Sequence, residues 1–283
     1  MILPWKCRQD INCRNSKWSE GSDMLWEKKF TKDSAAEACK ALVEAWKDDS
    51  NKVFVLRAAE KIDSVRDFYE SLFPSIGTPA ALAEDVNLGD RSKQRTGKIW
   101  MEVRFDPRFP DAYRHSANAQ PLHTDGSYIP TFPNSTLLAC VTNAGAGGET
   151  TFLDSEDLIA CLKLENPALL EKLMSRPMPH ARSGDSRSES VIRLEDGKLH
   201  VNWNYYCVAP DIDAETRKIA DEFHNYLLAS PAIKAKTLPV KLLPGDSVMW
   251  KDDELLHGRN SFEATKESER FIWKCAMNVG VFQ

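Results

Sequence analysis

The sequence of 283 residues lacks three features, and each absence argues against a class of protein. No apolar run approaches the roughly 18 residues that a transmembrane helix needs, so we expect no membrane span. No C-x-x-C pair is present, which argues against a zinc ribbon and against a thioredoxin-like motif. The net charge of −5 gives no excess of positive charge, so we expect no nucleic-acid partner.

The first residues and the cysteines predict a reduced, cytoplasmic protein. Pro4 and then Lys6 interrupt the start of the chain, so we expect no secretory signal. The seven cysteines are an odd number, and those at 140, 161 and 275 lie in apolar stretches typical of small buried side chains. A disulfide between Cys7 and Cys13 is an alternative that we do not favour.

The pattern along the chain predicts one domain over residues 1–283. Residues 1–30 carry three tryptophans among polar residues without a clear period, and we interpret them as an N-terminal arm. Apolar residues at three- and four-residue steps predict helices, whereas apolar or alternating runs predict strands. The predicted helices cover 34–46, 65–72, 157–162, 168–174 and 214–228. The predicted strands cover 52–58, 99–104, 136–142, 150–153, 240–243, 248–250 and 271–279.

Turn residues complete this prediction. A hairpin is expected over 191–206, because Asp196-Gly197 favours the positive φ angles of a type I′ turn. Two polar segments, 85–96 and 179–190, are predicted to be loops, and the second is interpreted as a flexible lid or a plain solvated loop. Many strands with helices inserted among them predict a mainly β fold, a sandwich or barrel with added helices.

The most informative pattern is an H-x-D, His123-Thr-Asp125. In a strand, residues i and i+2 project from one face, so one nitrogen and one oxygen ligand would point into the same space. A distant histidine would complete the two histidines and one carboxylate that mark non-haem Fe(II) oxygenases. His257 is our candidate for it. The alternative is that the pattern is a chance occurrence of ordinary core residues.

Three further patterns follow the H-x-D in order, and each is weak alone. They are Gly147-Gly-Glu-Thr150, then Pro244-Gly-Asp246 leading through Trp250 to His257, and then Arg270. With all four in order, the stretch from His123 to Lys274 resembles the taurine dioxygenase/TfdA-type family of Fe(II)- and 2-oxoglutarate-dependent dioxygenases. This group includes clavaminate synthase-like enzymes.

The resemblance implies a double-stranded β-helix, or jelly-roll, core with a metal at its open end. It implies that His123, Asp125 and His257 bind Fe(II), and that Thr150 and Arg270 hold the distal carboxylate of 2-oxoglutarate. A guanidinium binds a carboxylate bidentately and a hydroxyl adds one more donor, which suits that role. The alternative for Arg270 is a surface cation, and the alternative for Thr150 is an ordinary strand threonine.

The resemblance also implies a substrate site and a reaction. Lys274 lies four residues after Arg270, on the same face of a strand, and would bind an anionic group of the substrate; a solvated lysine is the alternative. Tyr128 would line the substrate pocket or belong to the core. The implied reaction consumes O2 and 2-oxoglutarate, releases succinate and CO2, and oxidises a C–H bond of a small anionic or amino-acid-like molecule, most simply by hydroxylation. The sequence does not indicate the substrate or the oligomeric state.

One pattern departs from the family. After the aromatic residue of the third pattern the family often has Asp-Asn, whereas here Trp250 is followed by Lys-Asp252-Asp-Glu, so we assign no contact to His257 from this segment. Arg259 is interpreted as structural. The histidines that match no ligand position are His115, His180, His200 and His224.

Two functions from other classes remain open. One is a zinc-dependent hydrolase that uses the same three ligands, and the other is a non-catalytic ligand-binding protein on the same scaffold. Neither function requires residues that hold a keto acid, so the presence of Thr150 and Arg270 favours the oxygenase over both.

Overall fold

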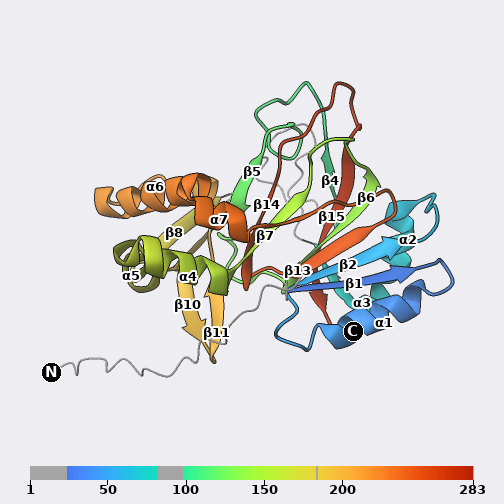
Figure 1. Ribbon diagram of the computed structural model, residues 1–283, viewed down its shortest axis with the longest axis horizontal. Coiled ribbons are helices and arrows are strands. Elements are labelled where there is room, and N and C mark those ends of the chain that lie inside the picture. The colour runs from blue at the N-terminus through green and yellow to red at the C-terminus, as the bar shows by residue number, and fades with distance from the viewer. Residues whose placement is uncertain (1–23, 82–97, 183, 283) are drawn as a thin grey trace.

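The computed structural model describes residues 24–81, 98–182 and 184–282. Its centre consists of two β-sheets with helices packed outside them (Figure 1). The larger sheet has the order β1 (Leu25–Phe30), β2 (Val53–Ala58), β13 (Ser247–Lys251), β6 (Ser135–Thr142), β15 (Phe271–Val279) and β3 (Gly77–Ala80), and β4 (Met101–Arg104) also pairs with β15. The smaller sheet has the order β12 (Leu238–Val240), β7 (Thr150–Asp154), β14 (Leu255–Arg259) and β5 (Gln120–His123).

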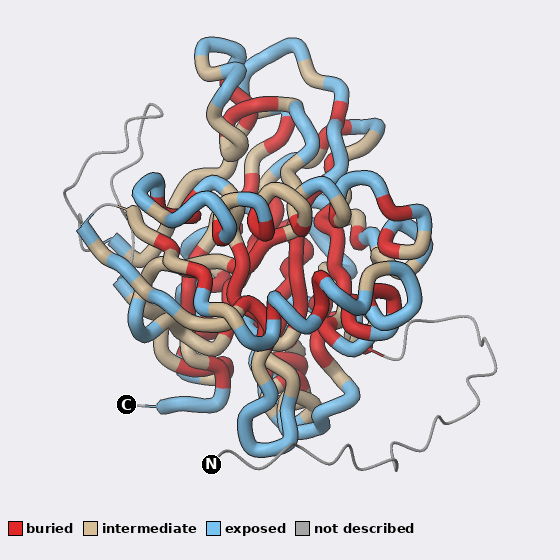
Figure 2. Tube along the Cα trace, turned by 90° about the vertical axis from the view of Figure 1, so that its left-hand side faces the viewer, coloured by how far each residue is buried: buried red, intermediate tan, exposed pale blue. Residues whose placement is uncertain are grey.

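The two sheets share an apolar core. β13 and β14 are buried at every residue, which explains why their segments contain few polar side chains outside the site. Phe152 and Leu255 of the smaller sheet belong to one cluster with Leu138, Val248 and Trp250 of the larger sheet. The buried chain lies in the middle of the molecule and exposed segments surround it (Figure 2). The prediction of a mainly β fold with added helices is confirmed.

Helices cover both sheets on the outside. Three of them, α1 (Ala35–Ala45), α2 (Val65–Ser71) and α3 (Phe73–Ile76), pack with the larger sheet in one apolar cluster. On the side of the smaller sheet lie α4 (Ser155–Glu165), α5 (Pro167–Ser175), α6 (Ala214–Ala229) and α7 (Pro231–Lys236). Together with the chain around Trp203 and Phe223 they form a second cluster, which Leu153 and Leu256 join from the smaller sheet.

The helices of this second group begin where the sequence provides a cap. The side chains of Asp154, Asn166, Asp213 and Ser230 each accept a hydrogen bond from a backbone N–H of the first turn of α4, α5, α6 and α7, respectively. Proline occupies the first turn of α5 and α7, where its missing N–H costs nothing. The five predicted helices are all present, and α3 and α7 are additional.

The predicted hairpin is also present, as β10 (Ile192–Glu195) and β11 (Lys198–Val201). Its turn has φ of 50° at Asp196 and 82° at Gly197, the positive values that the type I′ turn requires.

Three sequence predictions are wrong in part. Residues 25–30, expected in an arm, form the edge strand β1, which pairs in parallel with β2 and keeps its charged residues at the surface. In the segment 179–190, expected to be a flexible loop, residues 179–182 and 185–190 pair as strands β8 (Pro177–Arg182) and β9 (Asp185–Ser190), whose partly exposed position explains their polar sequence. The strand expected at 240–243 ends at Val240, and Leu243 is exposed despite its apolar side chain.

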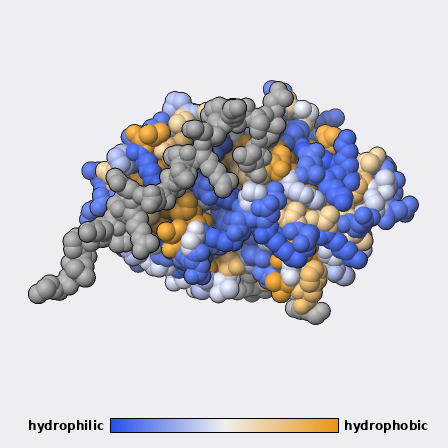
Figure 3. Space-filling view, turned by 60° about the horizontal axis from the view of Figure 1, so that its bottom comes forward, coloured by the Kyte–Doolittle hydropathy of each residue, from blue (hydrophilic) through white to orange (hydrophobic). Residues whose placement is uncertain are grey.

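Other expectations concern residues outside those described, namely the rest of the arm, the pair Cys7 and Cys13, and the segment 85–96. Within the described residues, Cys140, Cys161 and Cys275 are buried free thiols, as predicted. None of the described helices has both the length and the apolar character needed to cross a membrane. On the face shown in Figure 3, hydrophobic side chains appear as separate patches among hydrophilic ones.

Candidate metal centre and adjoining cavity

Three side chains, two from adjacent strands and one from the chain just after β5, meet at one point. His123, the last residue of β5, lies directly opposite His257 of β14, and their ring centroids are 4.2 Å apart. Asp125 follows two residues later, after the strand has ended, so the prediction that both lie in a strand is wrong for Asp125. One potential ligand atom from each of the three lies within 4.8 Å of the others. Among the described residues no other group of three or more His, Cys, Asp or Glu side chains meets this criterion, and the remaining histidines lie outside it.

Both histidines are held in a state that suits a metal ligand. Nδ1 of His123 lies 2.9 Å from the carbonyl oxygen of Pro121 and must donate to it, which leaves a lone pair on Nε2. The Nε2 amide of Gln120 donates to this lone pair at 3.1 Å. Burial lowers the pKa of His123, and burial together with the neighbouring His123 lowers the pKa of His257 well below its usual range. Both rings are therefore neutral at neutral pH.

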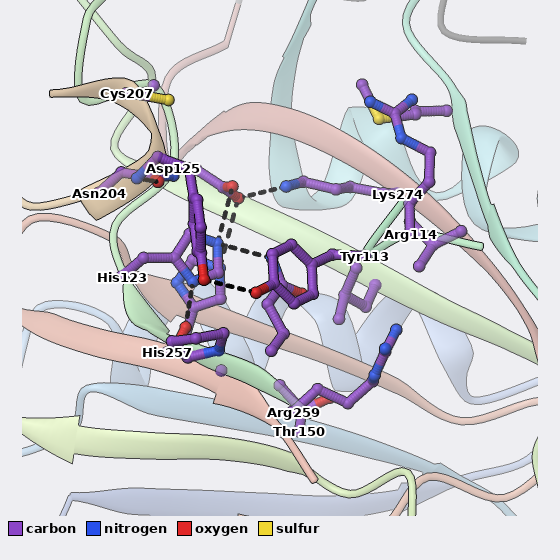
Figure 4. Close-up of a pocket in the computed structure, with 18 of the residues that line it drawn as sticks. Tyr113, Arg114, His123, Asp125, Thr150, Asn204, Cys207, His257, Arg259 and Lys274 are labelled. Carbon is purple, nitrogen blue, oxygen red and sulfur yellow. Dashed lines mark hydrogen bonds and ion pairs between the residues drawn. The ribbon is translucent and has the colours of Figure 1, made fainter. Parts of the chain in front are cut away.

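Asp125 supplies the negative charge of the site. Burial alone would raise the pKa of its carboxyl, but Lys274 and the two histidines outweigh burial and hold that pKa below its usual range. Oδ2 accepts a hydrogen bond from Lys274 Nζ at 2.5 Å (Figure 4). It accepts a second one from Thr136 Oγ1 at 3.0 Å. Oδ1 faces His123 Nε2 at 3.9 Å. Two neutral imidazoles and one carboxylate that converge in this way suit a divalent transition metal such as Fe(II).

A buried residue that the sequence left without a role, Asp252, connects these ligands. Its Oδ1 accepts from Trp250 Nε1 at 2.7 Å and lies 3.4 Å from His257 Nδ1, while its Oδ2 accepts from the backbone N–H of Asp125 at 3.1 Å. Burial and then the charge of Asp125 raise the pKa of the Asp252 carboxyl well above its usual range. The signal in the sequence is an acid two residues after Trp250, but the sequence here departs from the Asp-Asn that the family often has, and this departure concealed the signal.

The three residues open onto a cavity of about 720 Å³. Four other residues that the sequence assigned to the site also line it: Thr150, Arg270, Lys274 and Tyr128. Sequence reasoning missed further polar residues of its wall, because they come from segments without a recognised pattern. They include Tyr113, Arg114, Asn204, Tyr206 and Cys207.

One part of the wall is strongly basic. Arg270 and Arg259 are only 2% and 4% exposed, and their guanidinium carbons lie 5.4 and 5.0 Å from the centre of the Phe262 ring. Burial lowers the pKa of Arg270 to about 10, and burial together with Arg270 lowers the pKa of Arg259 to about 9. Neither forms an ion pair with an acid among the described residues.

The Gly-Gly pattern shapes this basic part. Gly147 and Gly148 have φ of 72° and 73°, which glycine adopts without strain. A Cβ at Gly147 would collide with the carbonyl oxygen of Ser261, and one at Gly148 would lie 3.3 Å from Nε of Arg270. The two glycines thus let the chain turn tightly beside Arg270 and enter β7 at Thr150.

The family model described as "Taurine catabolism dioxygenase TauD, TfdA family" matches residues 33–276. A uridine-5′-phosphate dioxygenase from Streptomyces sp. is 26% identical over 213 residues, which are 68% of this chain and 76% of that protein. A gamma-butyrobetaine dioxygenase from Homo sapiens is 26% identical over 53% of this chain and 42% of that protein.

Solved structures share the fold. An asparagine oxygenase in complex with Fe(II), 3-hydroxyasparagine and succinate superposes with a TM-score of 0.65, at 14% identity over 86% of this chain and 79% of that one. The non-haem iron oxygenase OrfP, in complex with Fe and alpha-ketoglutaric acid, gives a TM-score of 0.62 at 12% identity over 89% of this chain and 94% of that one. The double-stranded β-helix core implied by the sequence is confirmed.

Proposed function

The chain belongs to the TauD/TfdA family of dioxygenases, and on this premise we propose that His123, Asp125 and His257 form the iron site of an Fe(II)- and 2-oxoglutarate-dependent oxygenase. One observation carries the proposal. A buried set of two neutral histidines and one ionised aspartate opens onto the same cavity as buried arginines that have no acid partner among the described residues. The first feature suits a divalent metal, and the second suits an anionic cosubstrate.

Each residue has a distinct task in this site. Fe(II) bound by such a set activates O2 together with 2-oxoglutarate and supplies the oxidising chemistry. The hydrogen bond from His123 Nδ1 to Pro121 fixes the ring with its Nε2 lone pair toward the site. Oδ2 of Asp125 is occupied by Lys274 and Thr136, which leaves Oδ1 for the metal.

Arg270 and Thr150 are proposed to hold the distal carboxylate of 2-oxoglutarate. No side-chain hydrogen bond of Arg270 to another described residue is present, so its donors are available to a ligand. Thr150 begins β7 and is buried against the same cavity. A buried cation without a partner is costly, and an anionic ligand removes that cost.

The proposed substrate is a small anionic or amino-acid-like molecule whose C–H bond is hydroxylated. The named relatives act on uridine 5′-phosphate and gamma-butyrobetaine, and one structural neighbour contains 3-hydroxyasparagine, which supports this class. Lys274 is proposed to bind the anionic group, because its ammonium has three donors and Asp125 occupies one of them. Tyr128 is proposed to contact the rest of the substrate.

Replacing Lys274 with methionine tests the substrate assignment. We expect the KM for the substrate to rise about 10–100-fold, the loss typical of a hydrogen bond to a charged group. Binding of 2-oxoglutarate should stay near the wild-type value, and Lys274→Arg should restore most of the affinity for the substrate. Initial rates of succinate release measure both variants, with uridine 5′-phosphate, gamma-butyrobetaine and free amino acids as the first substrates. An unchanged KM in Lys274→Met would contradict the assignment.

Asp252 is proposed to position both His257 and Asp125. We expect Asp252→Ala to lower the Fe(II) affinity about 10–100-fold, as is usual when a group that orients metal ligands is removed. Asp252→Asn should retain most of the affinity, because it keeps an acceptor for Trp250 Nε1. Asp253→Ala is a matched control, since that neighbouring carboxylate is 57% exposed and pairs with His200 instead. Anaerobic metal titration measures the three variants, and wild-type affinity in Asp252→Ala would refute the role.

The function as a whole is tested by adding Fe(II) and 2-oxoglutarate to the apo-protein without oxygen. We expect a weak metal-to-ligand charge-transfer band in the visible spectrum, and its loss in His123→Ala. Tight zinc binding without such a band would support the hydrolase alternative. No metal binding at all would support a ligand-binding protein on this scaffold.

We further propose that the enzyme works in a reducing compartment, the cytoplasm. Among the described residues, Cys39, Cys140, Cys161 and Cys275 are buried free thiols, which supports this assignment.

A further inference from the structure

Arg259 differs from an ordinary structural arginine in its unused hydrogen-bonding capacity. Its Nη2 donates to the carbonyl oxygens of Ser116 and Asn118, at 2.9 and 2.5 Å, and so anchors the loop that precedes β5. Its Nε and Nη1 are buried, yet they have no hydrogen-bond partner among the described residues. A buried guanidinium with two idle nitrogens carries a desolvation cost that its two carbonyl acceptors and the Phe262 ring offset only in part.

The charge of Arg259 poses the same problem. Arg270 packs against the same Phe262 ring, so two buried cations lie close together with no acid partner among the described residues. Like charges in a desolvated site repel each other strongly. The arrangement becomes favourable when an anion enters the cavity that both residues line.

The strand pairing shows where this anion would sit. Arg259 of β14 is paired directly with Thr150 of β7, and directly opposed residues of an antiparallel pair project from the same face. Figure 4 shows these two residues together in the wall of the cavity. His257 precedes Arg259 by two residues and therefore projects from the same face of β14. A carboxylate that reaches the hydroxyl of Thr150 thus lies beside Arg259, two residues along β14 from the proposed metal ligand His257.

We propose that Arg259 is a second guanidinium for the distal carboxylate of the cosubstrate, which it binds together with Arg270 and Thr150. This inference rests on the proposed function and adds a specificity determinant to it. Two cations at this position select a 2-oxo acid that carries a second carboxylate over one that ends in a methyl group. Arg259 keeps its structural task as well, because only Nη2 is engaged by the loop.

The test compares two ligands of similar shape, 2-oxoglutarate and 2-oxopentanoate, which lacks the distal carboxylate. Each is titrated into the Fe(II)-loaded protein without oxygen, with the charge-transfer band and calorimetry as readouts, so that turnover is not needed. The variants are Arg259→Gln and Arg259→Lys. Arg108→Ala is the control for a disturbed loop, because Arg108 binds Asp106 in the same loop at 2.5 and 2.8 Å but does not line the cavity.

In Arg259→Gln we expect the affinity for 2-oxoglutarate to fall about 10–100-fold, the loss of a charge-assisted hydrogen bond. The affinity for 2-oxopentanoate should stay within about threefold of the wild-type value. Arg259→Lys should lose less affinity for 2-oxoglutarate than Arg259→Gln does. If Arg259→Gln does not fold, Arg259→Lys still tests the proposal. Arg108→Ala should bind both ligands as the wild type does.

Two results would overturn the inference. A parallel loss of affinity for both ligands would show that Arg259 acts only through the loop. Wild-type affinity for both ligands would show that it has no part in binding. Failure of the proposed function is distinguishable from either, because the wild-type protein itself would then form no complex with 2-oxoglutarate.

Discussion

Replacing Asp125 with alanine is expected to abolish substrate-dependent succinate formation and to cause the largest loss of any single change in this protein. The carboxylate is the only negative ligand of the proposed metal site, and it is also the partner of Lys274 at 2.5 Å. Without it, the ammonium group of Lys274 would face a divalent cation with no charge between them. Truncation of one partner of a desolvated charge pair costs about 2–5 kcal/mol of binding free energy, which corresponds to at least about thirtyfold in metal affinity.

The experiment separates the loss of charge from the loss of shape. Asp125→Asn keeps the size of the side chain and an acceptor for Thr136, but it removes the charge, so it should also bind Fe(II) weakly. The metal affinity of both variants is measured by anaerobic titration and their activity by succinate release. Thermal denaturation without metal serves as the control for folding. Near-normal succinate formation by Asp125→Ala would remove this residue from the ligand set.

The three metal ligands could be predicted from the sequence because two of them form a short pattern and because few residue types can bind the metal. The H-x-D and a later histidine in the expected order identified His123, Asp125 and His257 as one set, and the structure brings them together. The sequence did not reveal that His123 and His257 are directly opposed on adjacent strands, because strand register depends on the whole sheet. Asp252 was missed partly for the same reason, since its contact with the backbone of Asp125 joins segments 127 residues apart.

The parts of the fold that escaped prediction share a physical cause. Periodicity detects an element when one of its faces is buried, which holds for α1, α6 and β15. The edge strand β1 and the hairpin of β8 and β9 have polar sequences, and pairing with neighbouring strands defines them more than an apolar face does. Arg259 illustrates the same limit within the site, because its pairing with Thr150 follows from the register of β14 and β7.

Replacing Arg270 with methionine is expected to remove the response of the protein to 2-oxoglutarate without harming the fold. Its guanidinium is buried and has no side-chain hydrogen bond or ion pair to another described residue, so an apolar side chain of similar length should leave the stability of the ligand-free protein unchanged or higher. Binding should suffer, because truncation of one partner of a buried charge pair costs about 2–5 kcal/mol, at least about thirtyfold in affinity.

Thermal denaturation measures both effects of this change at once. A ligand at a hundred times its Kd stabilises the native state by about 2.7 kcal/mol, which raises Tm by roughly 4–5 °C for a chain of this length. At the same ligand concentration, a thirtyfold weaker Kd leaves a rise of less than about 2 °C. The metal-loaded Arg270→Met variant should therefore melt at or above the wild-type temperature without 2-oxoglutarate, and its Tm should rise little when 2-oxoglutarate is added. With 2-oxopentanoate the variant and the wild type should show the same rise in Tm, because this ligand has no distal carboxylate for Arg270 to bind. If the variant gains as much from 2-oxoglutarate as the wild type does, the distal carboxylate binds elsewhere and the basic part of the cavity has another ligand.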